Sequence, residues 1–263
     1  MPVQTFRVAR RPRSFVRVSG PDAGDYLQRM VSNDVLALAG GGSCEALLLT
    51  PKARVIAPLL VWRRGENDFL LLTEPELGER VRRELVRSRF AAKVEIEPEQ
   101  HSSLVVFGNA DGLPTREFGE PAVEVLDADV AGEPVPDEEL ELLRIRAGTP
   151  RTGRELDDRV LPAEAGLTET HVDFGKGCYP GQEPIARLHH RGHVNRRLRV
   201  LRVEGEDAIP YDAEIRHGEK VVGRVTSAAR DGGETLALGY VRVEVPEDAR
   251  LVAAGRPATF DRP

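Results

Sequence analysis

One cysteine lies in a setting that favours reactivity. The segment Lys176–Glu183 reads Lys-Gly-Cys-Tyr-Pro-Gly-Gln-Glu and places Cys178 between two glycines and two residues after a lysine. Glycine adopts positive φ freely and adds no side-chain cover, so Gly177 and Gly181 predict a tight, open turn. A neighbouring ammonium favours the nucleophilic thiolate. The residues therefore predict a reactive thiol at Cys178 that Lys176 activates, with an ordinary glycine-turn cysteine as the alternative.

The residues after the thiol predict a helix start beside a basic surface. Gln182 and Glu183 are expected to hydrogen-bond the loop and cap a helix that opens at Glu183-Pro184. No acidic residue occurs between Glu183 and Glu204, whereas arginine and histidine are frequent there. Arg187 and Arg191 are therefore candidates to hold an anion such as a phosphate, a polyglutamate tail or an RNA backbone. The alternative is a solvated basic face.

Composition bounds the class of protein. The chain has 263 residues, of which 40% are hydrophobic and 30% charged, as in a folded globular protein. Its net charge of −6 does not favour direct binding of nucleic acid, and no apolar run is long enough to cross a membrane. Two cysteines cannot form a disulfide framework, and the N-terminus lacks the apolar core of a secretory signal. We expect a cytoplasmic protein, with Cys44 inert in a buried strand.

Hydrophobic periodicity predicts an α+β fold that must position the cysteine loop. Helices are expected to open at Pro21, Glu74 and Pro136. After residue 196 short alternating strands with glycine turns indicate a small β-barrel. The predicted domains are therefore 1–195 and 196–263. Strands are expected before the barrel at residues 15–18, 46–49, 54–62, 69–72, 93–96 and 104–107.

Several motifs together resemble the YgfZ family of folate-binding iron–sulfur proteins. These are relatives of the aminomethyltransferase T-protein of the glycine cleavage system. The resemblance is most specific in the octapeptide and in the Ala186-Arg187 and Arg191-Gly192 pairs that follow it. Weaker matches follow in the expected order at residues 16–23, 31–35, 144–150, 161–164, 222–227 and 237–242. The resemblance implies a T-protein-like folate-binding fold of antiparallel sheets and packed helices, with region 1–195 as one or two interleaved subdomains and a C-terminal β-barrel.

The family resemblance also implies a function. It suggests an accessory factor for the assembly or repair of [4Fe–4S] clusters that supports radical enzymes, including tRNA-thiomethylating ones. Its partners would be iron–sulfur proteins or cluster carriers. One cysteine cannot hold a cluster alone, because clusters take about four ligands. Any cluster on Cys178 would therefore be transient and shared with a partner.

Two departures from the related proteins affect the choice between functions. Ala57-Pro58 stands where the T-proteins carry a pair of acids, and neither residue can move a proton. A non-enzymatic factor is therefore favoured over a folate-dependent aminomethyltransferase or other one-carbon transferase. Arg146 stands where the family commonly has a glutamate that suits a pterin ring. Arg144 and Arg146 remain candidate anion or folate ligands.

The resemblance implies tetrahydrofolate as a cofactor, which other residues would then have to hold. Tyr179 or Phe174 could stack on the ring, and the lost acid could be replaced by Glu155, Asp157 or Glu164. A non-catalytic folate-binding regulator with a structural Cys178 is a further alternative.

Two other chemistries are disfavoured. The histidines at positions 189 and 193 have a helical spacing but lack a second cysteine or an anchoring carboxylate, so no bound metal is expected. A cysteine hydrolase would need a base such as His171 in contact with Cys178, and nothing in the loop predicts that contact.

Overall fold

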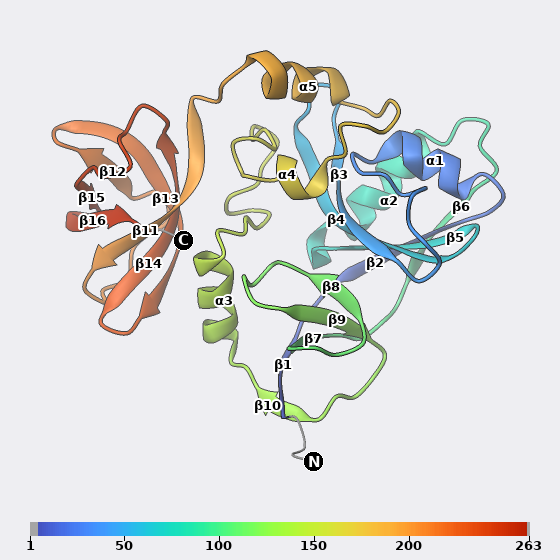
Figure 1. The fold of residues 1–263 in the computed structure, drawn as a ribbon, viewed down its shortest axis with the longest axis horizontal. Helices are drawn as coiled ribbons and strands as arrows, with labels where there is room; N and C mark the ends of the chain where they lie inside the picture. The colour runs from blue at the N-terminus through green and yellow to red at the C-terminus, as the bar shows by residue number, and fades with distance from the viewer. Residues whose placement is uncertain (1–4, 262–263) are drawn as a thin grey trace.

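The computed structural model describes residues 5–261, which form three β-rich lobes connected by helices and long loops (Figure 1). Helix α5 runs across one side of the molecule, next to the chain that enters the C-terminal barrel. In the described part of the chain no helix is long and apolar enough to cross a membrane.

The first lobe is a five-stranded antiparallel sheet covered by two helices. Helices α1 (Ala23–Met30) and α2 (Gly78–Arg87) bury Leu27, Val81 and Leu85 against it, and the 3-10 turn η1 (Pro75–Leu77) precedes α2. The strands, in spatial order, are β3 (Ser43–Leu49), β4 (Val55–Gly65), β5 (Asp68–Thr73), β2 (Ser14–Ser19) and β6 (Glu95–Glu99).

The second lobe is a smaller sheet built from both ends of the N-terminal half. Its edge strand β10 pairs with β1 in parallel, whereas the other neighbours are antiparallel. The strands, in spatial order, are β10 (Gly132–Pro134), β1 (Phe6–Arg10), β7 (Ser103–Phe107), β9 (Ala122–Leu126) and β8 (Leu113–Thr115).

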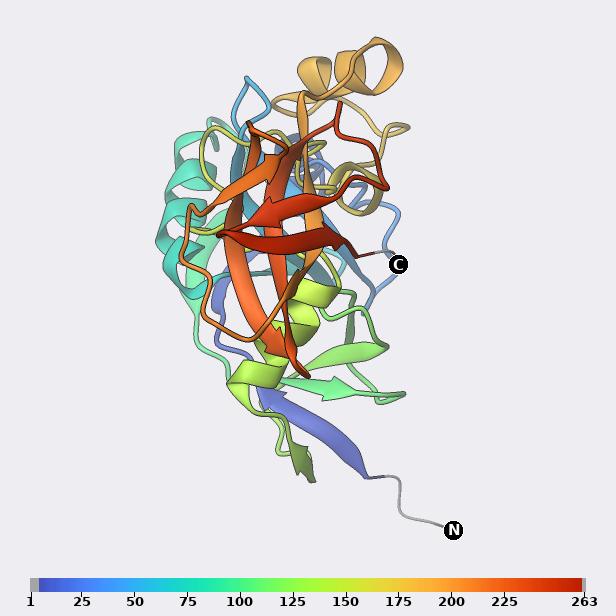
Figure 2. The same ribbon diagram turned by 90° about the vertical axis from the view of Figure 1, so that its left-hand side faces the viewer.

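The third lobe is a closed six-stranded barrel. Helix α3 (Asp137–Arg146) lies against its strands β13 and β14 (Figure 2), and the loop-rich segment that follows contains α4 (Thr168–His171) and α5 (Gln182–Arg191). The barrel order is β11 (Arg196–Glu204), β14 (Glu234–Arg242), β13 (Lys220–Asp231), β12 (Glu214–His217), β15 (Leu251–Ala253) and β16 (Arg256–Phe260).

The predicted α+β class and the C-terminal barrel are confirmed, whereas some elements differ from the sequence prediction. Helix α2 begins at Gly78, because the residues after Glu74 form a 3-10 turn first. Strands β1, β8, β9 and β10 were not expected; β8 and β10 are only three residues long and lie at the sheet edges, whereas β1 and β9 are five-residue interior strands. Strand β11 begins at Arg196, but the division into 1–195 and 196–263 stays a prediction.

Buried ion pairs hold the first two lobes together where the chain passes from β1 to β2. Arg13 Nε donates to Glu124 Oε1 at 2.9 Å, and the Glu124 side chain is fully buried on β9. Glu117 accepts from both Arg11 and Arg13, and Arg11 also reaches Glu74. Carboxylates of this kind are tolerated in the interior only while their cations are present.

Removing Arg13 should therefore destabilise the fold. We expect Arg13→Met to lower the free energy of unfolding by about 3–5 kcal/mol, because Glu124 would remain buried and unpaired. Urea denaturation measures the effect. The control is Arg17→Met, whose side chain is 39% exposed, so solvent screens its pair with Asp68 and the loss of stability should be much smaller. Equal losses in the two variants would contradict a special role for the buried network.

Candidate functional site

The predicted reactive cysteine lies at the surface. Cys178 is an exposed free thiol in the loop between α4 and α5, whereas Cys44 is partly buried on β3. Burial raises the pKa of the Cys44 thiol to about 12, which keeps it in the unreactive thiol form, as expected. Of the two cysteines in the chain, only Cys178 is open to a partner.

Gly181 fixes the exit from the cysteine loop. It is the N-cap of α5 with a φ of +84°, a conformation that favours glycine. A Cβ at this position would lie 2.7 Å from the carbonyl oxygen of Thr50 and 2.9 Å from the Cα of Ala53. The glycine therefore lets the loop pack directly on the β3–β4 turn. Gly177 has open space around it, so its effect is to leave Cys178 uncovered.

Lys176 anchors the loop to the end of α1. Its side chain is buried, and Nζ donates to the carbonyl oxygens of Gln28 at 2.6 Å, Val31 at 2.6 Å and Asn33 at 2.9 Å. An ammonium has three hydrogens, and these bonds use all of them. Lys176 thus caps the C-terminal end of α1 and has no N–H left to donate to Cys178, whereas an effect of its charge on the thiol stays a prediction. Burial lowers the pKa of Lys176 to about 8.

Other loop residues are also used structurally. Tyr179 is buried in an apolar cluster with its ring centroid 5.2 Å from Lys176 Nζ, so its ring is not open to a ligand. Phe174 stacks on His189, with ring centroids 4.1 Å apart. Glu183 pairs with Arg187 along the exposed side of α5 instead of capping the helix. For Gln182, the structure shows a backbone hydrogen bond from its N–H to the Tyr179 carbonyl.

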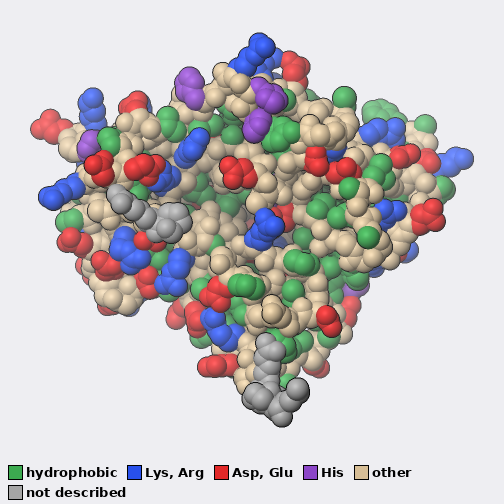
Figure 3. Space-filling model, in the orientation of Figure 1, with side chains coloured by type: hydrophobic (Ala, Val, Ile, Leu, Met, Phe, Trp, Pro, Cys, Tyr) green, Lys and Arg blue, Asp and Glu red, His purple; other side chains and the backbone are tan. Residues whose placement is uncertain are grey.

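The four candidate arginines lie in two places, on α5 and in the last turn of α3. Arg187 and Arg191 are exposed on α5, over which histidine side chains also gather (Figure 3). Arg146 is half exposed and pairs with Asp231 of the barrel at 2.8 Å. Arg144 is buried, and its donors go to Glu141, Thr149, Glu155 and Ser227. These hydrogen bonds join α3 to the barrel, so the Arg144 guanidinium is not available to a bound anion.

A cavity of about 360 Å³ lies where the three lobes meet. Residues from β3, β4, the end of β5 and the first strand of the barrel line it, and much of its wall is apolar. Pro58, from the position of the missing T-protein acids, is part of this wall. Three carboxylates also line it, those of Glu45, Glu74 and Glu117.

Glu74 has one oxygen without a partner. Its Oε1 accepts from Arg11 at 3.1 Å, whereas Oε2 is buried and has no hydrogen-bond donor among the described residues. The proposed replacement acids are elsewhere. Glu155 lies in the Arg144 cluster, Asp157 pairs with Arg159, and Glu164 pairs with Arg196. None of these three lines the central cavity.

His171 and Glu45 form a second polar group in the cavity wall. Burial lowers the pKa of His171 to about 4, and its Nδ1 lies 2.7 Å from Thr170 Oγ1 and 3.9 Å from Glu45 Oε2. Burial also raises the pKa of Glu45. His171 is thus neutral at physiological pH. Within residues 5–261 no group of three or more His, Cys, Asp or Glu side chains could hold a metal ion.

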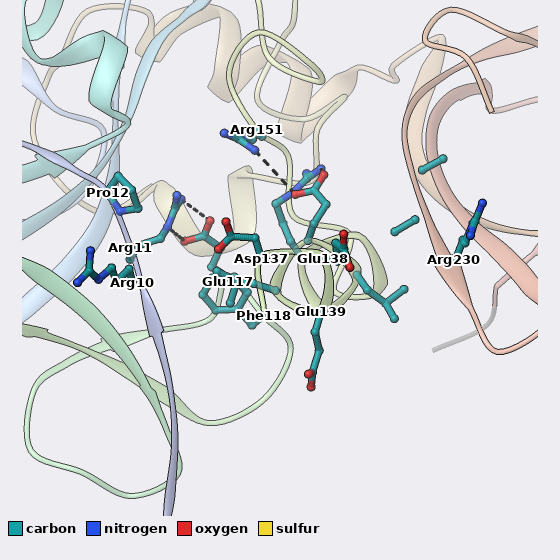
Figure 4. Close-up of a pocket in the computed structure, with 16 residues that line it drawn as sticks. Arg10, Arg11, Pro12, Glu117, Phe118, Asp137, Glu138, Glu139, Arg151 and Arg230 are labelled. Carbon is teal, nitrogen blue, oxygen red and sulfur yellow. Dashed lines mark hydrogen bonds and ion pairs between the residues drawn. The ribbon is translucent and has the colours of Figure 1, made fainter. Parts of the chain in front are cut away.

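A larger hollow of about 1040 Å³ adjoins the cavity along α3 (Figure 4). The two share Arg11 and Glu117, which point toward one another and are joined by an ion pair. Acidic residues of α3 face basic residues at its rim, so the hollow has no strong preference for one sign of charge.

The sequence analysis missed Glu45, Glu74 and His171 as cavity residues. Glu74 was interpreted only as a helix start, although it directly follows an apolar strand that had been predicted correctly. A carboxylate at the end of a central strand is a usable signal, because strand ends commonly open on binding sites. Nothing in the sequence placed Glu45 beside His171, since the two residues are 126 positions apart.

We expect Lys176→Met to lower the free energy of unfolding by about 1–3 kcal/mol, because three carbonyl groups lose a buried donor. Hydrogen exchange of residues 174–178 should rise as the loop loses its anchor. The control is Lys52→Met in the exposed β3–β4 turn. Unchanged stability and exchange in the Lys176 variant would exclude the anchoring role.

Acid should destabilise the protein through His171. Below pH 6.5 the unfolded chain protonates this histidine, whereas the folded chain does not until about pH 4. Protonation therefore favours the unfolded chain in this range. The free energy of unfolding should fall by up to about 3 kcal/mol as the pH drops from 6.5 to 4. Denaturation curves at pH 7 and pH 4.5 measure this loss. The loss of stability should be smaller in His171→Gln and unchanged in His193→Gln, which replaces an exposed histidine. An equal loss in the wild type and both variants would show that other titrating groups cause it.

Comparisons with known proteins agree with this architecture. The family model described as the CAF17 C-terminal beta-barrel domain matches residues 196–263. The chain is 27% identical to the mitochondrial iron–sulfur cluster assembly factor IBA57 homolog of Pyricularia oryzae, over 95% of this chain and 74% of that protein. It is 30% identical to the corresponding homolog of Mycosarcoma maydis, over 74% of this chain and 56% of that protein.

A solved structure shows the same fold over nearly the whole chain. It is the glycine cleavage system aminomethyltransferase T from Bartonella henselae, with a TM-score of 0.85 and 19% sequence identity. The match covers 98% of this chain and 85% of that one. The T-protein-like fold is therefore confirmed, and the chain is similar to IBA57-type iron–sulfur cluster assembly factors over most of its length and to CAF17 in its C-terminal barrel.

Proposed function

We propose that this protein acts in the cytoplasm as an accessory factor for the assembly or repair of [4Fe–4S] clusters, through Cys178. It is a homologue of iron–sulfur cluster assembly factors. The observation that carries the proposal is the exposed thiol on an anchored loop. Lys176 and Gly181 secure the loop on both sides of Cys178, and neither covers the sulfur.

This arrangement suits a thiol that is presented to another protein. A cluster needs about four ligands, so Cys178 can supply only one of them. An iron–sulfur protein or cluster carrier would bring the others, and the cluster would be cargo shared at the contact. The exposed basic side of α5, which includes Arg187 and Arg191, lies next to the loop and can contact such a partner. The clients would include radical enzymes that thiomethylate tRNA.

The central cavity supports tetrahydrofolate as the cofactor. The buried, unpartnered Oε2 of Glu74 suits a ligand with N–H donors, and the apolar wall suits a flat ring. Glu45, Glu74 and His171 would contact the ring, and none of the predicted ligands Arg144, Arg146 and Tyr179 is needed. When bound, tetrahydrofolate supplies a one-carbon carrier.

The cavity carboxylates also support a second candidate, a folate-dependent one-carbon transferase. Glu45 is half buried with a raised pKa, which is a property of many proton-transferring acids. Ala57 and Pro58, however, leave β4 without an acid. Turnover of a methylamine or glycine-type donor would favour this candidate, whereas folate binding with full function in a Cys178 variant would favour a regulator.

The test of the cluster function uses cells that lack this gene. We expect the activity of a [4Fe–4S] tRNA-thiomethylating enzyme to fall in these cells and to return with the wild-type protein. Cys178→Ala should fail to restore it at equal expression, because the exposed ligand is lost. The matched control is Cys44→Ala, which removes the partly buried thiol and should restore activity. Restoration by both variants would make Cys178 structural, and no effect of the deletion would refute the cluster function.

A further inference from the structure

We propose that Glu74 is the residue that recognises the pterin ring, by accepting hydrogen bonds from its donor edge with Oε2. This inference rests on the folate part of the proposed function. The group recognised is the 2-amino-4-oxo pyrimidine ring of the pterin. Glu74 would supply the acceptor carboxylate that Arg146 cannot provide.

The position of Glu74 is suited to this role. It is the first residue after β5, and its side chain is 6% exposed in the wall of the central cavity. Arg11 holds Oε1 at 3.1 Å and supplies a compensating positive charge, so that the carboxylate can remain ionised in the interior. Arg11 is itself fixed by Glu117. The carboxylate is therefore oriented before a ligand enters.

The free oxygen gives the site its chemical preference. A buried acceptor without a donor costs free energy, which a ligand that brings an N–H group regains. The pyrimidine edge of a pterin carries an amino group beside a ring N–H, and a carboxylate accepts such donors through charge-assisted bonds. Leu60, Leu72 and Leu198 supply apolar wall for the rest of the ring.

The other cavity carboxylates are less suitable. Glu117 already accepts from Arg11 and Arg13 with both oxygens. Burial raises the pKa of Glu45, which favours its neutral form, and Glu45 already has a backbone hydrogen bond with Arg116. Glu74 is therefore the one cavity carboxylate, among the described residues, that combines a close cation with an unpartnered oxygen.

Calorimetric titration of the full chain with 5-formyltetrahydrofolate tests this assignment. Glu74→Gln should bind about 10- to 100-fold more weakly than the wild type, because a charge-assisted acceptor is lost. The matched control Glu76→Gln makes the same charge change two residues away, on an exposed side chain, and should bind as the wild type does. p-Aminobenzoylglutamate lacks the pterin ring, so any binding of this probe should be equal in all three proteins.

Thermal unfolding without ligand first establishes that the variants are folded. If Glu74→Gln melts early, Glu74→Asp replaces it, since it keeps the charge but withdraws the oxygens from the cavity and should also bind more weakly. Equal affinity of the folded Glu74 variant and the wild type would overturn the assignment while leaving folate binding intact. No binding by the wild type would overturn both the assignment and the folate part of the proposed function. Neither result bears on the Cys178 rescue experiment.

Discussion

The hydrogen bonds between the Lys176 ammonium and the end of α1 determine how this protein presents its thiol. A helix end leaves carbonyl groups without partners and carries partial negative charge, so a cation is stabilised there even when it is buried. Three carbonyl oxygens take up the whole donor capacity of Lys176. The loop is thereby tied to the first lobe, and Cys178, two residues on, is left exposed.

In the interior, buried arginines connect the lobes to one another. Arg11 and Arg13 join the two sheets through Glu74, Glu117 and Glu124, and Arg144 joins α3 to the barrel through Glu155 and Ser227. Arg11, Arg13, Glu74 and Glu117 line the central cavity, and most of the polar atoms in these clusters are hydrogen-bonded to one another. The exception is Glu74, where one oxygen is left over. A network that holds three lobes together thus also defines the polar character of the space between them.

The thiol and the cavity lie on one continuous segment. Residues Thr170 and His171 line the cavity, and Cys178 follows seven positions after His171. Ser32, just after α1, holds this segment from both directions, since its hydroxyl donates to the His171 carbonyl and its own carbonyl accepts from Asp173 N–H. The central cavity and the surface thiol therefore lie on one segment without sharing a residue.

The sequence by itself determined the fold class, the barrel, the four longer helices α1, α2, α3 and α5, and the place of the exposed thiol, whereas the short helix α4 was expected to be loop. These follow from local properties, namely periodicity, glycine turns and a specific motif. Gly181 is an example, since its positive φ was implied by the turn in which it occurs. Only the tertiary structure decided the partners of the charged residues. Lys176 meets carbonyls some 145 positions away, Arg144 is consumed by the barrel, and Glu74 faces the cavity beside Arg11. A long charged side chain can reach many groups, and which of them it meets depends on how distant strands and helices pack, which no local pattern encodes.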